Sequence, residues 1–325
     1  MLGRVAESLY WMFRNIERIE NLSRFLEVSS AMDLDSGIAV EPWTPLIDAC
    51  GDRELFQAVK GSFSAEEIVD FLVQSRNNPS SIRSCLNLAR ENARQIRDVL
   101  SNEMWEHLNT MYWRLKNERP MTGLPSQEWL LKVRQDCQLF YGIADVCFSR
   151  GLGWQFCQLG RLVERADKTA RILDVKYFLL LPHGETVGGV IDQLQWIAVL
   201  KTAGGYQMFR QSRQLSITPK GVAQFLLLDP NFPRSVRFCL DGIHQSLIKI
   251  DPLQGASERP LGRHVGMMQA RWTYTDIAEI IKYGLHESID RLQQDLNNLH
   301  NQLEQVYFQA PQSVPSPRSS TQRTP

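Results

Sequence analysis

The feature that most constrains the fold is a long-range repeat in the sequence. Residues 14–28 read RNIERIENLSRFLEV, and residues 161–175 read RLVERADKTARILDV at a shift of 147 positions. FLVQSRNNPSSIRSCL (71–86) matches FLLLDPNFPRSVRFCL (225–240) at a shift of 154. Between these blocks, a shift of 153 superimposes three identical pairs, namely Trp43, Gly51 and Phe56 on Trp196, Gly204 and Phe209. Because self-similarity in constant order indicates repeated units, we expect two diverged copies of one unit.

The repeated blocks have the periodicity of helices. Apolar side chains between Leu2 and Leu26 recur at alternating spacings of three and four, and a matching stripe runs from Leu152 to Tyr177. In both copies, Asn-x-Pro followed by Ser (77–81 and 231–235) predicts a helix start, because the residue before a proline avoids helical geometry. Further helices are expected at 64–75, 80–100, 102–117, 126–149, 187–201, 218–228, 234–249, 272–283 and 286–308.

These patterns predict an all-α fold, since no segment alternates with period two for long enough to indicate a strand. We expect a helical bundle in which the two tandem units are related by an approximate two-fold axis. The first unit would span 1–150, and the second would span 151–310 and pack on the first as one body. The segment 311–325 is rich in Pro, Ser and Thr and is expected to be disordered.

Composition excludes several classes of function. Lys and Arg together number 36 and so do Asp and Glu, which argues against a nucleic-acid-binding surface. No apolar stretch approaches the roughly 20 residues of a membrane helix, and the N-terminus lacks the features of a signal peptide. Six cysteines without a Cys-x-x-Cys pair are typical of reduced, mostly buried thiols. We therefore expect a cytoplasmic protein without a membrane or nucleic-acid partner.

The most informative polar feature is a Glu-Arg pair in the middle of each predicted long helix. Glu17 and Glu164 lie just off the apolar stripe. The first helix also carries Tyr10, Trp11 and Phe13, so it is apolar on several sides and its charges are expected to be partly buried. A buried carboxylate would need a partner. One interpretation is an internal network that ties helices together. Another is a symmetric polar site that binds a carboxylate, phosphate or peptide group, and ordinary surface ion pairs are a third. The ligand-binding candidates are the arginines of both copies, namely Arg14, Arg18, Arg24, Arg161, Arg165 and Arg171.

Two more arginines recur beside cysteines, after the predicted helix starts. Arg83 and Arg237 could face a ligand, but such an arginine more often supports a helix end or pairs with a neighbouring acid. No Glu-x-x-His, P-loop, His-Glu-x-x-His or Gly-x-Ser-x-Gly motif occurs in the sequence. We therefore predict no metal site and no cofactor.

The chain resembles the alpha-E family, bacterial helical proteins named for a Glu-Arg motif. The resemblance spans about 1–310 and rests on RNIERIENLSRFLEV, NPSSIRSCLNLARENARQIRDVLSNEMWEHLN, and PRSVRFCL followed by the turn at Gly284-Leu285. It implies an association with circularly permuted ATP-grasp proteins, sometimes in the same chain, and with transglutaminase-like proteases. ATP-grasp ligases join a carboxylate to an amine, so the implied setting is the formation or modification of an amide-linked peptide.

Three functional hypotheses follow. In the first, the protein is a non-catalytic helical partner of such an amide ligase and binds or positions a peptide or the ligase. The second is an enzyme in which Glu17 and Glu164, with pKa values raised by burial, form an acid–base or carboxylate-binding site with the neighbouring arginines. The third is a purely structural protein, and a homo-oligomer is compatible with each. The missing catalytic motifs favour the first.

Overall fold

The computed structural model describes residues 2–34, 43–60, 62–118, 123–179, 189–212, 216–251 and 259–309. Within these ranges the chain forms fifteen α-helices and no strand, which confirms the expected all-α class. No helix in the described ranges is long and apolar enough to cross a membrane. All six cysteines are free thiols, and five of them are buried. The segment expected to be disordered, 311–325, lies outside the described residues.

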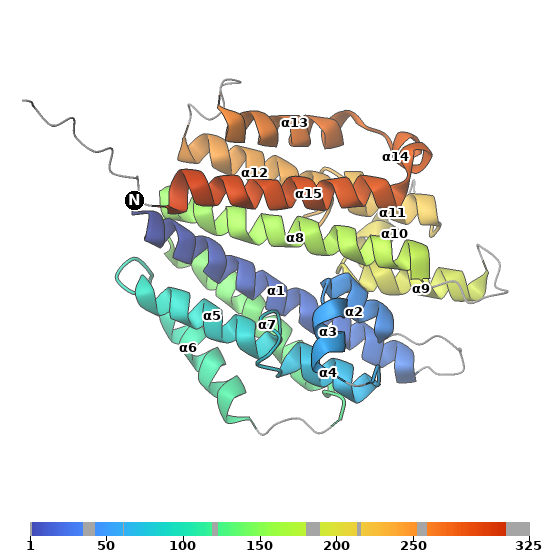
Figure 1. Cartoon of the computed structure of the whole chain (residues 1–325), viewed down its shortest axis with the longest axis horizontal. Helices are drawn as coiled ribbons and strands as arrows, with labels where there is room; N and C mark the ends of the chain where they lie inside the picture. The colour runs from blue at the N-terminus through green and yellow to red at the C-terminus, as the bar shows by residue number, and fades with distance from the viewer. Residues whose placement is uncertain are drawn as a thin grey trace, which may run out of the picture.

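Two long helices, α1 (Gly3–Leu34) and α8 (Leu152–Leu179), lie side by side at the centre of the molecule (Figure 1). Helices α5 (Ile82–Gln95) and α7 (Gln127–Cys147) pack against α1, and α6 (Asn102–Asn117) packs on both of them. On the other side, α12 (Val236–Ile250) and α15 (Leu285–Leu303) pack against α8, and α13 (Pro260–Tyr274) covers them. The central pair is therefore enclosed by helices on both sides.

Shorter helices complete the body: α2 (Thr44–Cys50), α3 (Arg53–Val59), α4 (Ala65–Val73), α9 (Val190–Thr202), α10 (Tyr206–Gln211), α11 (Pro219–Leu228) and α14 (Ile277–Tyr283). Two of them pack on the central helix that is more distant in sequence. Helix α2 contacts α8, and α9 contacts α1. The two halves of the chain are thus in contact through these short helices as well as through α1 and α8.

The central helices are buried because they are apolar on more than one side. Tyr10, Phe13, Ile16 and Ile19 of α1 all have fully buried side chains, although they do not lie on one face. The two helices approach closely at Gly160 of α8. A Cβ atom there would lie 2.1 Å from the Tyr10 carbonyl oxygen, so only glycine fits this contact. The polar residues on these helices are consequently placed deep in the protein.

The helix starts after the two Asn-x-Pro segments were predicted correctly, and a capping serine marks each of them. Ser81 accepts a hydrogen bond from the Ser84 amide at 3.1 Å and caps α5, and Ser235 does the same for the Phe238 amide of α12 at 3.1 Å. One prediction was wrong. The helix expected at 272–283 is two helices, α13 and α14, because the Asp276 carboxylate caps a new helix start. Helices α2, α3 and α10 and most of α13 were not predicted.

The last helical turn of the described chain closes the bundle beside the first residues of α1. A π-helical turn, Glu304–Phe308, follows α15 and packs on α1. A Cβ atom at Gly3 would lie only 2.6 Å from the Phe308 carbonyl oxygen. Residues 3 and 308 therefore meet at one end of the molecule (Figure 1).

Candidate functional site

Glu17, in the middle of α1, is the centre of a buried ion-pair network. Its side chain is completely inaccessible to solvent. Arg165 of α8 donates two parallel hydrogen bonds to the carboxylate, at 2.9 and 2.8 Å, which is the two-pronged geometry that arginine and carboxylate favour. The Tyr141 hydroxyl of α7 donates a third hydrogen bond at 3.0 Å. Glu17 therefore joins three helices.

A further arginine, Arg234, contacts Glu17 and was not among the candidates from the sequence. It lies just before α12 and donates to the Glu17 carboxylate at 3.0 Å and to the Asn21 side chain at 2.7 Å. It also pairs with Glu20 at 2.8 Å. The sequence match at a shift of 154 places Ser80 opposite Arg234, so comparison of the matched segments could not reveal this arginine. Its place between Pro233 and a capping serine was the available signal.

Glu164 of α8 has the reciprocal arrangement with α1. It is also fully buried, and Arg18 donates two hydrogen bonds to it, at 2.6 and 2.9 Å. Arg14 donates another at 2.9 Å and holds the Tyr10 hydroxyl at 3.0 Å. Each central helix thus supplies a glutamate to the arginines of the other. We call these contacts the Glu-Arg exchange.

The Glu-Arg exchange keeps both carboxyl groups ionised. Burial alone would raise the pKa of Glu17, but the charges of Arg165 and Arg234 outweigh it and hold that pKa below the ordinary value. Burial likewise opposes ionisation of Glu164, yet Arg18 and Arg14 lower the pKa of its carboxyl. This direction is opposite to the raised pKa that we hypothesised for acid–base catalysis. The hypothesis of raised pKa values was wrong because the arginines are in direct contact with the carboxylates.

Arg161, the third candidate on α8, is held less closely. Its Nε atom is 3.7 Å from Glu17, and its guanidinium lies over the Tyr141 ring, 4.0 Å from the ring centroid. Burial and the neighbouring charge of Arg165 lower its pKa. This side chain therefore adds positive charge around Glu17 without a direct hydrogen bond to it.

Arg24 and Arg171 occupy matching places at the ends of the network. Arg24 pairs with Glu20 one turn earlier at 2.8 Å, and Arg171 pairs with Asp167 in the same way at 3.0 Å. Each guanidinium lies against a glycine of a turn that is distant in sequence. A Cβ atom at Gly204 would lie 3.0 Å from Arg24, and one at Gly51 would lie 2.9 Å from Arg171.

The last two candidates, Arg83 and Arg237, are not part of the Glu-Arg exchange. Arg83 donates to the Leu115 carbonyl oxygen at 3.1 Å, near the end of α6, so it supports a helix end. The Nε atom of Arg237 is buried without a hydrogen-bond partner in the described residues. Cys85 and Cys239, two residues further on in each case, are buried in the hydrophobic core.

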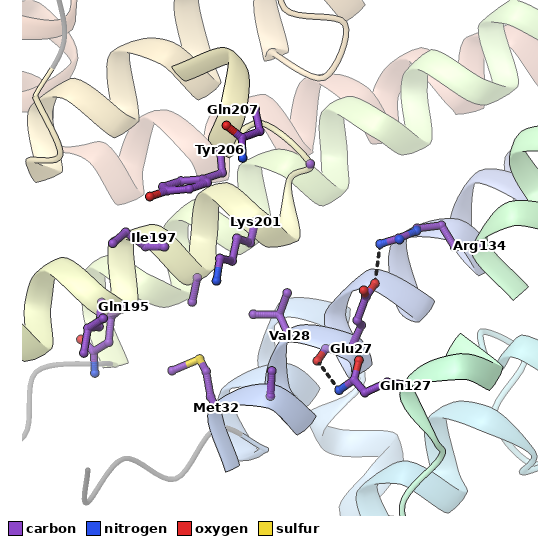
Figure 2. Close-up of a pocket in the computed structure, with 14 residues that line it drawn as sticks. Glu27, Val28, Met32, Gln127, Arg134, Gln195, Ile197, Lys201, Tyr206 and Gln207 are labelled. Carbon is purple, nitrogen blue, oxygen red and sulfur yellow. Dashed lines mark hydrogen bonds and ion pairs between the residues drawn. The ribbon is translucent and has the colours of Figure 1, made fainter. Parts of the chain in front are cut away.

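The accessible part of this region is a cavity of about 510 Å³ beyond the end of the network. Figure 2 shows its two walls, formed by the end of α1 on one side and by α9 and α10 on the other. Gly204, which contacts Arg24, lines it as well. Within the described ranges, no group of His, Cys, Asp and Glu side chains has the arrangement needed to hold a metal ion.

The fold and these contacts define an all-helical protein organised around buried, reciprocal Glu-Arg ion pairs. The family model of Alpha-E, described as a predicted alpha-helical domain with a conserved ER motif, matches residues 1–308. The chain belongs to the Alpha-E family, and the resemblance noted in the sequence is confirmed.

The chain is also similar to longer curated proteins. An uncharacterized protein of Mycobacterium bovis and one from each of two strains of Mycobacterium tuberculosis are 23% identical to it over 330 residues. These alignments cover 93% of this chain but 36% of each relative. The chain thus spans about a third of the length of the relatives it matches. No solved structure matches it.

Proposed function

We propose that this chain is a non-catalytic helical partner of an ATP-grasp-type amide ligase and that it binds or positions a peptide or the ligase. The observation that carries the proposal is the Glu-Arg exchange. The two best candidates for a reacting group, Glu17 and Glu164, are fully buried, ionised and held by arginines. They stabilise the contact between α1 and α8 and leave the neighbouring cavity free for binding. The ligase itself comes from the family resemblance.

The length of the relatives supports a role within a larger assembly. Roughly two thirds of each mycobacterial relative lies outside the matched region. An all-helical unit that accounts for one part of a longer chain is suited to act beside other domains. The same resemblance extends the proposal to a transglutaminase-like protease as a second partner.

The alternative of an enzyme with a buried acid–base site is less well supported. A general base must reach its substrate and must have a pKa near the working pH. Glu17 and Glu164 have no solvent exposure, and their pKa values are lowered. A carboxylate-binding site at these arginines would have to displace an internal glutamate. A purely structural or oligomer-forming protein is the remaining alternative.

We further infer that the two halves of the chain are diverged copies of one unit. The matched positions in the sequence make matched contacts: Glu17 with Arg165 and Glu164 with Arg18. The turns at Gly51 and Gly204 each receive an arginine from the other half. The thiols of Cys85 and Cys239 both approach the carbonyl oxygen of the proline six residues earlier, at 3.6 and 3.8 Å. Reciprocal contacts of this kind are expected for an internal duplication.

The test of the ligase proposal is purification of the tagged, full-length chain from its own cells, with and without ATP, and identification of the proteins that remain bound. We expect an ATP-grasp protein to be recovered. A binding assay with the two purified proteins would then establish that the contact is direct. A chain that elutes as a monomer or homo-oligomer, with and without ATP, would contradict the proposal and favour the structural alternative.

A further inference from the structure

The cavity at the end of α1 has the size and lining of a small-ligand site. Its volume of about 510 Å³ falls within the range of roughly 300–1,000 Å³ that is typical of such sites. Residues of α1, α7, α9 and α10 form its walls, so the helical framework fixes their relative positions. Its ligand can be inferred from the charges, amides and apolar groups of these walls.

Among the described residues that line the cavity, one cationic group has no partner. The Glu27 carboxylate forms an ion pair with Arg134 of α7, and the Glu27 carbonyl oxygen accepts a hydrogen bond from Gln127 at 3.1 Å. Lys201 extends from α9 into the space between the walls (Figure 2). Among the described residues, its ammonium group has neither an ion pair nor a hydrogen bond. Lys201 is exposed, so its solvated ammonium group is available to pair with a ligand that carries a single negative charge.

The remaining lining groups suit an apolar side chain and an amide. Val28 and Met32 on α1 face Ile197 on α9 across the cavity (Figure 2). The half-buried Tyr206 ring adds a flat surface beside them. The next residue in the chain is Gln207, and its exposed amide can both donate and accept hydrogen bonds. A ligand that combines a carboxylate, an amide and a small apolar group would use all three kinds of group.

We propose that this cavity binds the carboxyl end of a peptide that terminates in an apolar residue, with Lys201 paired to the terminal carboxylate. A free apolar amino acid shares the carboxylate and the side chain but also carries an ammonium group. Because Arg134 already engages the Glu27 carboxylate, the described lining residues offer that ammonium no free anion. A single lysine is also matched to one carboxylate rather than to a doubly charged phosphate. The inference rests on the proposed function for the source of the peptide only.

The test is calorimetric titration of the full chain with three probes: N-acetyl-alanyl-leucine, its carboxamide, and free leucine. We expect the N-acetyl dipeptide acid to bind with one-to-one stoichiometry. Both other probes should bind at least about fivefold more weakly, because each loses a charge-assisted hydrogen bond or buries an unpaired ammonium. Equal binding of acid and carboxamide, or no binding of the acid, would overturn the proposal. Free leucine binding as tightly as the acid would overturn the assignment to a peptide end.

Variants at position 201 locate the interaction. We expect Lys201→Met to weaken binding of the N-acetyl dipeptide acid by about fivefold to tenfold and to leave binding of the carboxamide unchanged. Lys201→Arg should keep the affinity for the acid, because it keeps the positive charge. The matched control is Lys249→Met, because Lys249 is an exposed lysine of α12 that does not line the cavity. This variant should bind the acid as tightly as the unmodified protein. If Lys201→Met binds the acid like the unmodified protein, the proposed role of Lys201 is wrong.

The two proposals fail independently. Binding of the dipeptide is measured with the isolated chain, whereas the ligase proposal depends on a second protein. Recovery of an ATP-grasp protein without dipeptide binding would overturn only the inference about the cavity. Dipeptide binding without any recovered ligase would overturn only the proposed partner.

Discussion

At the scale of single residues, the interior of this protein depends on a few charges that water does not reach. Glu17 meets Arg165, Arg234 and Tyr141, and none of these partners is exposed by more than a tenth of its surface. Ion pairs in such places are costly to leave incomplete, because the remaining charge has neither water nor a partner. Two consequences can be measured.

Glu17→Gln should destabilise the protein by about 3 kcal/mol, because it leaves the buried guanidinium groups of Arg165 and Arg234 without a counter-charge. Urea unfolding followed by circular dichroism measures the change. The matched control is Glu91→Gln, which weakens ion pairs with the exposed Arg94 and the half-buried Arg90 and should cost less than about 1 kcal/mol. Equal stability of the Glu17→Gln and control variants would show that the network does not hold the helices together.

The lowered pKa values of Glu17 and Glu164 also predict the effect of acid. In the folded protein these carboxyls release their protons at lower pH than in the unfolded chain, where the ordinary value is 4.5. Their contribution to stability is therefore complete above that value and is lost as the pH falls below it. The urea midpoint of the unmodified protein should decrease from pH 7 down to pH 3. The midpoint of the Glu164→Gln variant should decrease less steeply over the same range. A variant slope equal to that of the unmodified protein would contradict the assignment.

At the scale of helices and turns, the long helices were predictable and the short ones were not. A stripe of apolar residues sustained over many turns, such as that of α1, gives a strong periodic signal. Helices of six or seven residues, such as α2, α3 and α10, are too short to show a period and depend on packing. The Glu-Arg candidates came from positions just off the stripe, but their partners depend on how α1 and α8 meet. Tyr141 and Arg234 were missed for that reason.

Gly204, in the turn between α9 and α10, gives a prediction for which another glycine of the protein serves as the control. Gly204 has a φ of 66°, which side-chain-bearing residues adopt at a cost, and a Cβ atom there would crowd Arg24. Gly204→Ala should lower stability by about 1–2 kcal/mol. Gly142→Ala, in an exposed part of α7 with open space around its Cβ position, should raise stability by about 0.5–1 kcal/mol. Thermal unfolding of the two variants should shift in opposite directions.

At the scale of the whole molecule, neither half contains a complete set of ion-pair partners. Glu17 lies in the first half and its arginines in the second, while Glu164 has the opposite arrangement. The contact between α1 and α8 also buries apolar surface that each half alone would expose. The proposed copies are therefore expected to be interdependent rather than autonomous domains.

Expression of residues 1–150 and 151–308 as separate chains tests this interdependence. We expect each chain alone to lack a cooperative unfolding transition, and we expect the two together to form a one-to-one complex that unfolds cooperatively. Size-exclusion chromatography and circular dichroism distinguish these states. Stable, monomeric folding of either chain alone would show that the Glu-Arg exchange joins domains that fold independently.

The meeting of Gly3 and Phe308 at one end of the bundle limits how a tethered peptide can reach the proposed binding cavity. Val28, at the cavity, lies 25 residues further along α1, and a helix of that length spans roughly 37 Å. A fully extended tether covers at most about 3.3–3.6 Å per residue. A peptide joined to either residue therefore needs a tether of at least about eleven residues to enter the cavity of its own molecule. A peptide on a shorter tether could enter only the cavity of a neighbouring molecule.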